Sequence, residues 1–455
     1  MNKVDLVVAG GRLVTPDGIR EGAVAVENGI VVAVGHDGAM PPTKRRIEVD
    51  GLLVMPGAID VHVHFREPGF SHKETWRTAT QAAALGGVTT VFDMPNTDPP
   101  TATAAAVRDK IAIASAQSLV DFGVYGYLGE NISDLAPMAE AGAVAFKLYM
   151  GSENPLVPCP SDGAILDAFE VTRSLGLRCT VHAENTSILE WRGRKLREVG
   201  RTDALAHLEQ HADIATVEAV QRTALFAEWT GCRVHIAHES CRCSVPIIAA
   251  AKGRGIDVTA ETCPHYLLLS TKDGTRIGAN ALRVKPPVRE PGHGEVLFAA
   301  LLAGVIDMVS TDHAPHLASE KHRESIWDCA PGFPGVETSM RLMLTQAEAG
   351  RMTYPDYVRM ACEAPARAFG LYPRKGALLP GSDADIVVVD PGHRERITGE
   401  RLHSIGRATP FEGTETIGAP VMTFVRGALV AERGRIVGEA GTGLCVIPRR
   451  AERDS

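Results

Sequence analysis

The stretch Ile59-Asp60-Val61-His62-Val63-His64-Phe65-Arg66 decides how this chain folds. Its apolar, β-branched composition predicts a buried strand, in which alternate side chains point to opposite faces. His62 and His64 therefore lie on one face of the strand, while Val61 and Val63 pack on the other. Two imidazoles held side by side on a rigid strand form half of a site for a divalent metal such as zinc.

The sequence around this strand alternates short apolar strands with helical stretches of about a dozen residues. This rhythm predicts an α/β fold, a (β/α)8 TIM-type barrel that occupies residues 56–374. The G-x-G-x-x-G motif of an open dinucleotide-binding sheet does not follow the first strand. Residues 1–55 and 375–455 instead show the short strands and glycine turns of β hairpins. We expect the two termini to build one smaller β-sandwich domain together.

Bulk composition narrows the function classes. A net charge of -8 over 455 residues gives no basic face, so nucleic acid is not an expected partner. No apolar run is long enough to cross a membrane, and the N-terminus lacks the pattern of a secretion signal. Nine scattered cysteines fit free thiols in a reducing cytosol, so we expect a cytoplasmic protein. Cys241 and Cys243 are close enough for a metal or redox pair, although their spacing differs from that of common zinc knuckles.

Four further polar residues lie at the ends of predicted barrel strands: Lys147, His182, His238 and Asp312. Each alone has an ordinary explanation, such as a hydrogen-bonded core histidine, a helix N-cap or a lysine that reaches the surface. Together with the two histidines of the first strand they predict a metal centre, because TIM barrels perform chemistry at these strand ends. A buried ammonium would be repelled by a metal ion. Carbamylation of Lys147 by carbon dioxide would instead provide a carbamate able to bridge two ions.

Longer motifs identify relatives of this chain. They are Pro56 to Gly69 (PGAIDVHVHFREPG), Met94 to Thr97 (MPNT), Phe146 to Tyr149 (FKLY), His182 to Glu184 (HAE), Asp312 to His316 (DHAPH), Pro331 to Gly335 (PGFPG), Lys375 to Asp385 (KGALLPGSDAD) and Pro410 to Gly413 (PFEG). On these motifs the chain resembles the cyclic amidohydrolases of the amidohydrolase superfamily, and among them most closely the dihydroorotases. The resemblance extends over essentially the whole chain.

The resemblance implies a binuclear centre of two divalent metal ions, with zinc favoured by the imidazole ligands. His62, His64 and Asp312 would bind the more buried ion, and His182 and His238 the more exposed one. Carbamylated Lys147 and a hydroxide would bridge the pair. The two ions would lower the pKa of the water between them, and Asp312 would pass its proton to the leaving amide nitrogen.

The same resemblance implies the reversible hydrolysis of L-dihydroorotate to N-carbamoyl-L-aspartate, a step of pyrimidine biosynthesis. In dihydroorotases the residues that match Arg66, Asn96 and His316 hold the substrate carboxylate, which suits the planar fork of a guanidinium. Lys285 stands where relatives carry an asparagine or an arginine. It could supply the charge of that arginine but not its geometry. Relatives also suggest a homodimer or a homotetramer.

Three alternatives remain open. Glu261 to Leu267 (ETCPHYL) resembles allantoinases and hydantoinases, but allantoin is neutral and would leave Arg66 without an ionic partner. Dihydropyrimidinases and hydantoinases place a tyrosine five residues after the bridging lysine, where this chain has Ser152. Some dihydroorotase-like chains are non-catalytic partners of aspartate transcarbamoylase, and these have lost metal ligands that this chain retains.

Overall fold

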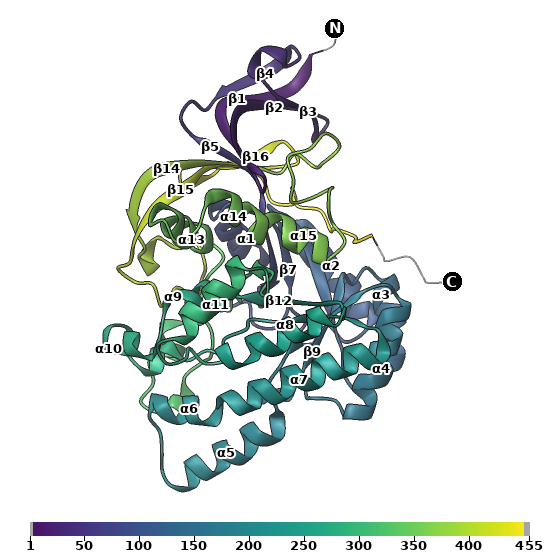
Figure 1. Ribbon diagram of the computed structural model, residues 1–455, viewed down its shortest axis with the longest axis vertical. Helices are drawn as coiled ribbons and strands as arrows, with labels where there is room; N and C mark the ends of the chain where they lie inside the picture. The colour runs from purple at the N-terminus through teal and green to yellow at the C-terminus, as the bar shows by residue number, and fades with distance from the viewer. Residues whose placement is uncertain (1–2, 450–455) are drawn as a thin grey trace.

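The computed structural model describes residues 3–449, which form a barrel and a large sheet beside it (Figure 1). Eight parallel strands, in the order β13-β12-β11-β10-β9-β8-β7-β6, form the barrel wall. They are β6 (Ala58–Val63), β7 (Val88–Asp93), β8 (Asp121–Tyr127), β9 (Ala145–Tyr149), β10 (Arg178–His182), β11 (Arg233–Ile236), β12 (Val258–Thr262) and β13 (Met308–Val309). The predicted (β/α)8 barrel is confirmed.

The barrel closes between its first and last strands through the segment that follows β13. Val63 forms a parallel bridge with His313, and the amide of His64 donates to the carbonyl of His313 over 2.7 Å. This closure brings the carboxyl end of β6 against the carboxyl end of β13. Residues from opposite ends of the barrel sequence thereby become neighbours.

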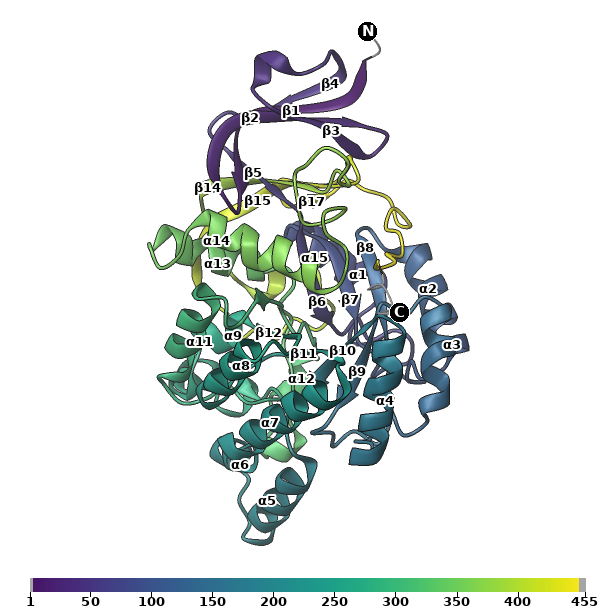
Figure 2. The same ribbon diagram turned by 45° about the vertical axis from the view of Figure 1, so that its right-hand side comes forward.

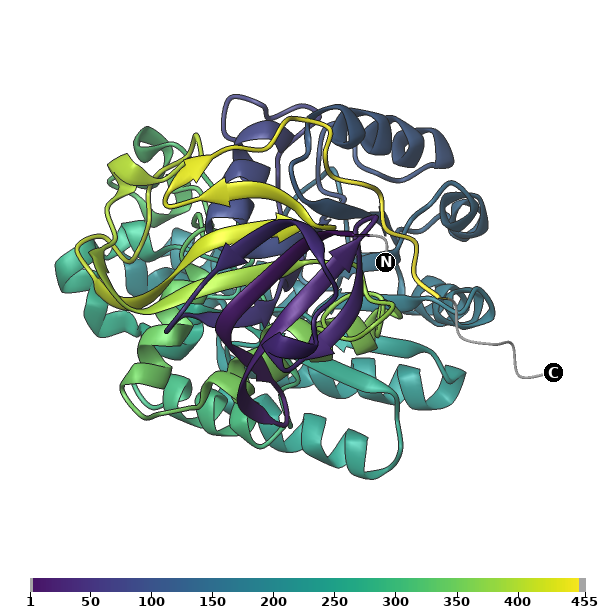
Figure 3. The ribbon, with the colours of Figure 1, turned by 90° about the horizontal axis from the view of Figure 1, so that it is seen from above.

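The second domain is built from both ends of the chain, as predicted. Its strands join in one continuous sheet, because β14 pairs antiparallel with β5. The nine strands are β1 (Val4–Thr15), β2 (Gly18–Glu27), β3 (Ile30–Gly35), β4 (Thr43–Glu48), β5 (Leu53–Pro56), β14 (Ile386–Arg396), β15 (Glu415–Val425), β16 (Ala428–Glu432) and β17 (Arg435–Ile436). Figure 3 shows the N-terminal and C-terminal strands side by side above the barrel. Leu6, Val24, Ile386 and Phe424 share one buried apolar cluster.

Helices cover the outside of the barrel (Figure 2). The α-helices are α1 (Trp76–Leu85), α2 (Ala104–Gln117), α3 (Leu135–Glu140), α4 (Asp162–Ser174), α5 (Thr186–Glu198), α6 (Ala204–Gln210), α7 (Asp213–Thr230), α8 (Val245–Gly253), α9 (Pro264–Leu268), α10 (Gly274–Ile277), α11 (His293–Leu302), α12 (Ala318–Lys321), α13 (Ser339–Glu348), α14 (Tyr354–Val358) and α15 (Ala364–Ala368). Among residues 3–449, no helix combines the length and apolar character that crossing a bilayer requires.

A single residue, Gly57, separates the sheet from the barrel, since β5 ends at Pro56 and β6 begins at Ala58. A side chain at position 57 would place its Cβ 2.0 Å from Oγ1 of Thr89, so only glycine allows this close approach. The amide of Gly57 donates to the carbonyl of Asp385, which precedes β14. The first barrel strand, which carries the histidine pair, is thus fixed directly to the sheet.

Candidate active site

The six predicted metal ligands converge at the carboxyl ends of the barrel strands. Donor atoms of His62, His64 and Asp312 all lie within 4.8 Å of one another. Nε2 of His64 is 3.0 Å from Oδ1 of Asp312, and Nε2 of His62 is 3.5 Å from the same oxygen. The His62 ring centroid lies 5.0 Å from that of His238. The two predicted halves of the centre therefore adjoin.

His182 and His238 face each other across the second half of the cluster. Nδ1 of His182 lies 3.0 Å from Nε2 of His238, and both rings are almost fully buried. Burial lowers the pKa of both imidazoles, which favours their neutral forms. Neutral imidazole is the form that binds a metal ion. This pair of converging nitrogens fits a shared ion.

Lys147 lies at the centre of the cluster and is fully buried. Its Nζ has no hydrogen-bond partner among residues 3–449 and stands 5.1 Å from the centroid of the Tyr149 ring. Burial lowers the pKa of Lys147 to about 8, although the carboxylates of Glu261 and Asp312 oppose the shift. An unpartnered amine with this reduced basicity fits conversion to a carbamate better than service as a buried cation.

Two buried glutamates orient the histidine ligands. Oε1 of Glu261 lies 2.5 Å from Nδ1 of His62 and accepts from the amide of His238 over 3.0 Å. Oε2 of Glu184 lies 2.9 Å from Nε2 of His182. Such partners fix the tautomer, so that Nε2 of His62 and Nδ1 of His182 are left for a metal. Sequence reasoning missed Glu261 in this role, although Glu261 also lies near the end of a barrel strand.

Three residues of the site have a left-handed backbone. The φ angles are 66° at Arg66, 37° at His238 and 46° at Asp312. This region is uncommon for residues other than glycine and costs about 1–2 kcal/mol. Strained backbone of this kind concentrates at functional sites, where it aims side chains that a regular strand would direct elsewhere.

A cavity of about 240 Å³ opens beside the ligands. The four predicted substrate residues Arg66, Asn96, Lys285 and His316 all line it. Nη2 of Arg66 lies 3.1 Å from Nε2 of His316, so these two groups adjoin at the rim of the metal cluster. Asn96 and Lys285 have additional bonds. Oδ1 of Asn96 is 2.7 Å from Nδ1 of His64, and the ammonium of Lys285 pairs with Glu153.

The Arg66 guanidinium is the most unusual of these groups. Arg66 is only 9% exposed, forms no ion pair within residues 3–449, and its Nε has no hydrogen-bond partner there. The neighbouring Glu67 accepts from the amide of Trp76 over 2.9 Å instead of pairing with Arg66. Burial lowers the pKa of Arg66, but a guanidinium stays charged at neutral pH. Carboxylates such as Asp312 act on this charge from a distance, but within residues 3–449 none forms an ion pair with it.

Tyr149 also lines the cavity, with a buried hydroxyl that has no partner among residues 3–449. Burial raises its pKa well above the usual range, so the hydroxyl keeps its proton. The tyrosine that hydantoinases place five residues after the bridging lysine is absent here, and Tyr149 follows Lys147 by two positions instead. That spacing, however, places Tyr149 on the same face of β9 as Lys147. The hydroxyl is a free donor at the site.

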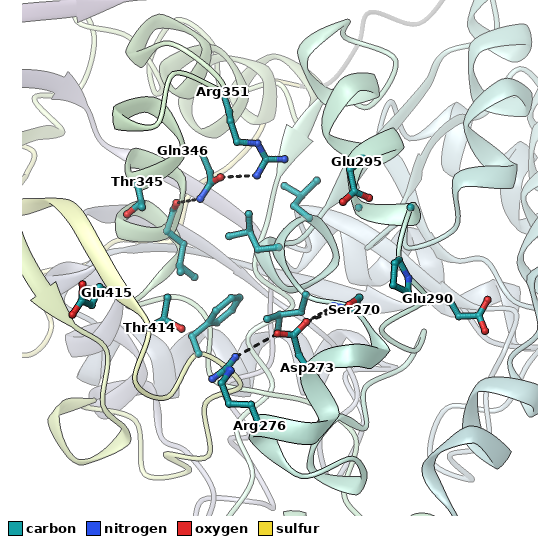
Figure 4. A pocket seen from close by; sticks show the side chains of 18 residues that line it. Ser270, Asp273, Arg276, Glu290, Glu295, Thr345, Gln346, Arg351, Thr414 and Glu415 are labelled. Atoms are coloured by element: carbon teal, nitrogen blue, oxygen red, sulfur yellow. Dashed lines mark hydrogen bonds and ion pairs between the residues drawn. The ribbon is translucent and has the colours of Figure 1, made fainter.

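A separate cavity of about 480 Å³ lies between α9, α11 and α13 (Figure 4). Both of its arginines have a partner within the lining. Arg276 lies 3.7 Å from Asp273, and Nη1 of Arg351 donates to Gln346 over 2.7 Å. The residues that line it include no histidine and no cysteine. The chemistry-bearing groups gather at the smaller cavity.

Comparison with known proteins places this site in context. Residues 53–430 match the Amidohydrolase family. The chain belongs to this family. The solved structure of an L-hydantoinase (dihydropyrimidinase) from Arthrobacter aurescens superposes on this amidohydrolase with a TM-score of 0.94 and 35% sequence identity, covering 97% of this chain and 99% of that one.

Curated relatives of this amidohydrolase have different names. An allantoinase of Deinococcus radiodurans is 35% identical over 439 residues, which cover 96% of this chain and 97% of the relative. A dihydroorotase of Halobacterium salinarum is 41% identical over 380 residues, which cover 83% of this chain and 86% of the relative. All these names describe enzymes that open cyclic amides. This amidohydrolase is a hydrolase of cyclic amides.

Proposed function

We propose that this amidohydrolase is a dihydroorotase that interconverts L-dihydroorotate and N-carbamoyl-L-aspartate. The observation that carries the proposal is the buried Arg66 guanidinium, which forms no ion pair within residues 3–449 and lines the cavity beside the proposed metal ligands. A buried cation is stable only when it is paired. A carboxylate on the substrate would provide that pairing. A neutral ring such as allantoin or hydantoin would not.

Three side chains can share the carboxylate. Arg66 offers charged N–H donors, and the Asn96 amide nitrogen is a further donor in the same cavity. The His316 ring lies between two cations, with Nζ of Lys73 3.3 Å from Nδ1 and Nη2 of Arg66 3.1 Å from Nε2. Nε2 also lies 2.9 Å from the carbonyl oxygen of Pro331, at the edge of the cavity. Lys285, already paired with Glu153, would contribute mainly to the shape and the local field.

The residues fit a pair of divalent ions, with zinc preferred. His62, His64 and Asp312 would hold one, and His182 and His238 the other. The neutral amine of Lys147 would add to the carbon of CO2 and lose one proton, giving a carbamate that would help to hold the ions. When bound, the ions would supply Lewis acidity that activates water and polarises the ring carbonyl.

The chain's own groups would then manage the protons and the developing charge. Asp312 would accept the proton of the attacking water and return it to the ring nitrogen as the C–N bond breaks. Interaction with His62 and His64 keeps the pKa of Asp312 low, at about 2 despite its burial, so it begins the reaction as a carboxylate. The Tyr149 hydroxyl would donate to the carbonyl oxygen as negative charge develops there.

The deciding experiment compares substrates and variants. Protein reconstituted with zinc and bicarbonate is assayed on L-dihydroorotate, allantoin and hydantoin, using wild type, Arg66→Ala and Arg66→Lys. We expect wild type to prefer dihydroorotate. We expect kcat/KM for dihydroorotate to fall at least 100-fold in Arg66→Ala, a loss of about 3 kcal/mol, as charged hydrogen bonds are removed. Glu67→Gln serves as the neighbouring control and should retain activity.

A hydantoinase or allantoinase activity is the second candidate. It is favoured by the end-to-end coverage of the L-hydantoinase and allantoinase relatives. Faster turnover of allantoin or hydantoin than of dihydroorotate, unchanged by Arg66→Ala, would select this candidate. Arg66 would then be a structural residue, and the proposed metal chemistry would stand.

A further inference from the structure

A second cluster of metal-binding side chains lies outside the active site. Donor atoms of Asp213, Cys241 and His293 are all within 4.8 Å of one another. Cys243 adjoins them, with its Sγ 3.6 Å from Oδ2 of Asp213. We propose that Asp213, Cys241, Cys243 and His293 form a structural site for a thiophilic divalent ion, with zinc as the preferred metal.

The distances from Oδ2 of Asp213 to the other donor atoms suit ligands of one tetrahedral ion. Zinc bonds of about 2.3 Å to sulfur and about 2.0 Å to nitrogen or oxygen separate tetrahedral ligands by roughly 3.3–3.8 Å. The Sγ atom of Cys243 lies 3.6 Å from this oxygen, and Nε2 of His293 lies 3.9 Å from it. Two sulfurs, one nitrogen and one oxygen make a set of four. Asp213, Cys241 and His293 already lie within 4.8 Å of one another, and the exposed Cys243 side chain would move inward to close the set.

Polar groups surround the sulfur of Cys241. Burial raises the pKa of this thiol, so a bound ion would have to displace its proton, a change that Arg289 and a hydrogen bond from the backbone amide of Cys243 assist. The guanidinium of Arg289 donates to Oδ1 of Asp213 over 2.9 Å, which leaves Oδ2 for the ion. Two thiolates, a carboxylate and a zinc ion together carry one negative charge, and Arg289 balances it. Cys241 is buried, whereas Cys243 is exposed, so an ion can enter from solvent.

The His293 ring binds the same loop on its other side. Nδ1 accepts from the backbone amide of Arg242 over 3.2 Å, and the ring also hydrogen-bonds the backbone of Ser240. Binding an ion through Nε2 would require the tautomer in which Nδ1 gives up the bond from Arg242 and donates to the Ser240 carbonyl. Histidine ligands commonly donate to a backbone carbonyl in this way.

A bound ion would connect three structural elements close to His238, one of the proposed active-site ligands. Asp213 begins α7, Cys241 and Cys243 flank the start of η3 (Arg242–Ser244), and His293 begins α11. The loop that they hold follows directly from His238, whose backbone is strained. A bound ion would therefore brace the position of His238 without touching the substrate.

Cobalt substitution tests this proposal separately from catalysis. The six proposed active-site ligands offer only nitrogen and oxygen, whereas the second cluster offers two sulfurs. Full-length protein reconstituted with Co2+ should show a near-ultraviolet thiolate-to-cobalt charge-transfer band. Cys241→Ser and Cys243→Ser should each remove the band and about one metal equivalent per chain. Cys445→Ser, a change at a partly buried cysteine elsewhere, should leave both unchanged.

Two further measurements keep the result decisive. Lys147→Ala should lose active-site metal but retain the charge-transfer band. Cys243 is exposed, so Cys243→Ser should fold. Its thermal unfolding midpoint should lie below that of wild type when both proteins hold metal, and the two midpoints should become equal after chelation. A fully cobalt-loaded wild type without the band, or a band that survives both cysteine substitutions, would overturn the proposal.

Discussion

His64 and Asp312 are 248 positions apart in the sequence, yet Nε2 of His64 lies 3.0 Å from Oδ1 of Asp312. Barrel closure produces this contact, because His64 and His313 pair through the backbone between the first strand and the segment after the last. The seam of the barrel is thus also the place where one half of the proposed metal centre is assembled. Fold closure and metal binding therefore depend on the same few residues.

The role of Glu261 predicts a metal-affinity defect in Glu261→Gln. The amide keeps the shape of the side chain but removes the negative charge that faces His62 and His235. Nε2 of His235 lies 3.1 Å from the Glu261 carboxylate. We expect zinc affinity to fall about 10- to 100-fold, as is usual when a partner of a ligand histidine is lost. Metal retained after dialysis against graded chelator measures it.

Glu337→Gln is the matched control for this experiment. Glu337 is similarly buried but binds His403, remote from the site. Equal zinc retention in the two variants would show that Glu261 does not tune the centre.

The free hydroxyl of Tyr149 predicts a defect confined to turnover. Tyr149→Phe removes a donor that has no partner within residues 3–449, so the fold and the metal content should be unaffected. We expect kcat to fall about 100-fold with little change in KM, since the bond would form mainly in the transition state. Tyr127→Phe is the control, because the Tyr127 hydroxyl already donates to Pro158. An unchanged kcat in Tyr149→Phe would exclude this role.

The reduced basicity of Lys147 predicts how carbamylation depends on pH. Only the neutral amine reacts with CO2, and burial lowers the pKa of Lys147 to about 8. About one amine in ten is neutral at pH 7 and about nine in ten at pH 9. At fixed dissolved CO2, the initial rate of carbamylation of metal-free protein should therefore rise through pH 8 and level off above pH 9. Incorporation of labelled CO2, trapped by added zinc, measures that rate.

A rate that rises only near the ordinary lysine pKa of 10.5 would contradict this account of the Lys147 environment. Lys147→Ala gives the background incorporation. Activity is not needed for this measurement, so it does not depend on which ring the enzyme opens.

A buried charge network predicts that the two parts of the protein are coupled in stability. Lys375 is 1% exposed and pairs with three carboxylates. Asp121 lies at the start of β8. Asp383 and Asp385 lie before β14, and their carboxylate oxygens are 3.0 and 2.7 Å from Nζ of Lys375. Lys375→Met would leave Asp383 and Asp385 without their cation, whereas Asp121 would keep Arg426. We expect a loss of about 3–5 kcal/mol in the free energy of unfolding, measured by denaturant titration.

Lys44→Met is the contrasting change for that titration. Lys44 and Asp5 form an ion pair on the surface, with side chains 65% and 41% exposed. Solvent screens such pairs, so no measurable change in stability is expected. Similar effects of the two substitutions would show that the buried network does not connect the sheet and the barrel energetically.

Much of this molecule was predictable from local sequence. Period-two alternation placed His62 and His64 on one face of a strand, and the repeated strand–helix rhythm gave the barrel. The hairpin texture at both ends predicted a domain that the two termini share. Strand ends also pointed to Lys147, His182, His238 and Asp312. The inferences about strands and barrel succeed because side-chain direction in a strand follows from backbone geometry alone, while the ligand roles stay predictions.

Other features were decided by tertiary structure. Only packing shows that, within residues 3–449, Nζ of Lys147 and the Tyr149 hydroxyl have no hydrogen-bond partner and buried Arg66 has no ion-pair partner. Packing also shows that Glu261 contacts His62. The approach of Asp213 and His293 to Cys241 likewise depends on how two helices start beside one loop. Burial and partnership are properties of the folded surroundings, which lie far away in sequence. Spacing along the chain determined which residues could serve as metal ligands or substrate contacts. Closure of the barrel determined which of these residues lie next to one another.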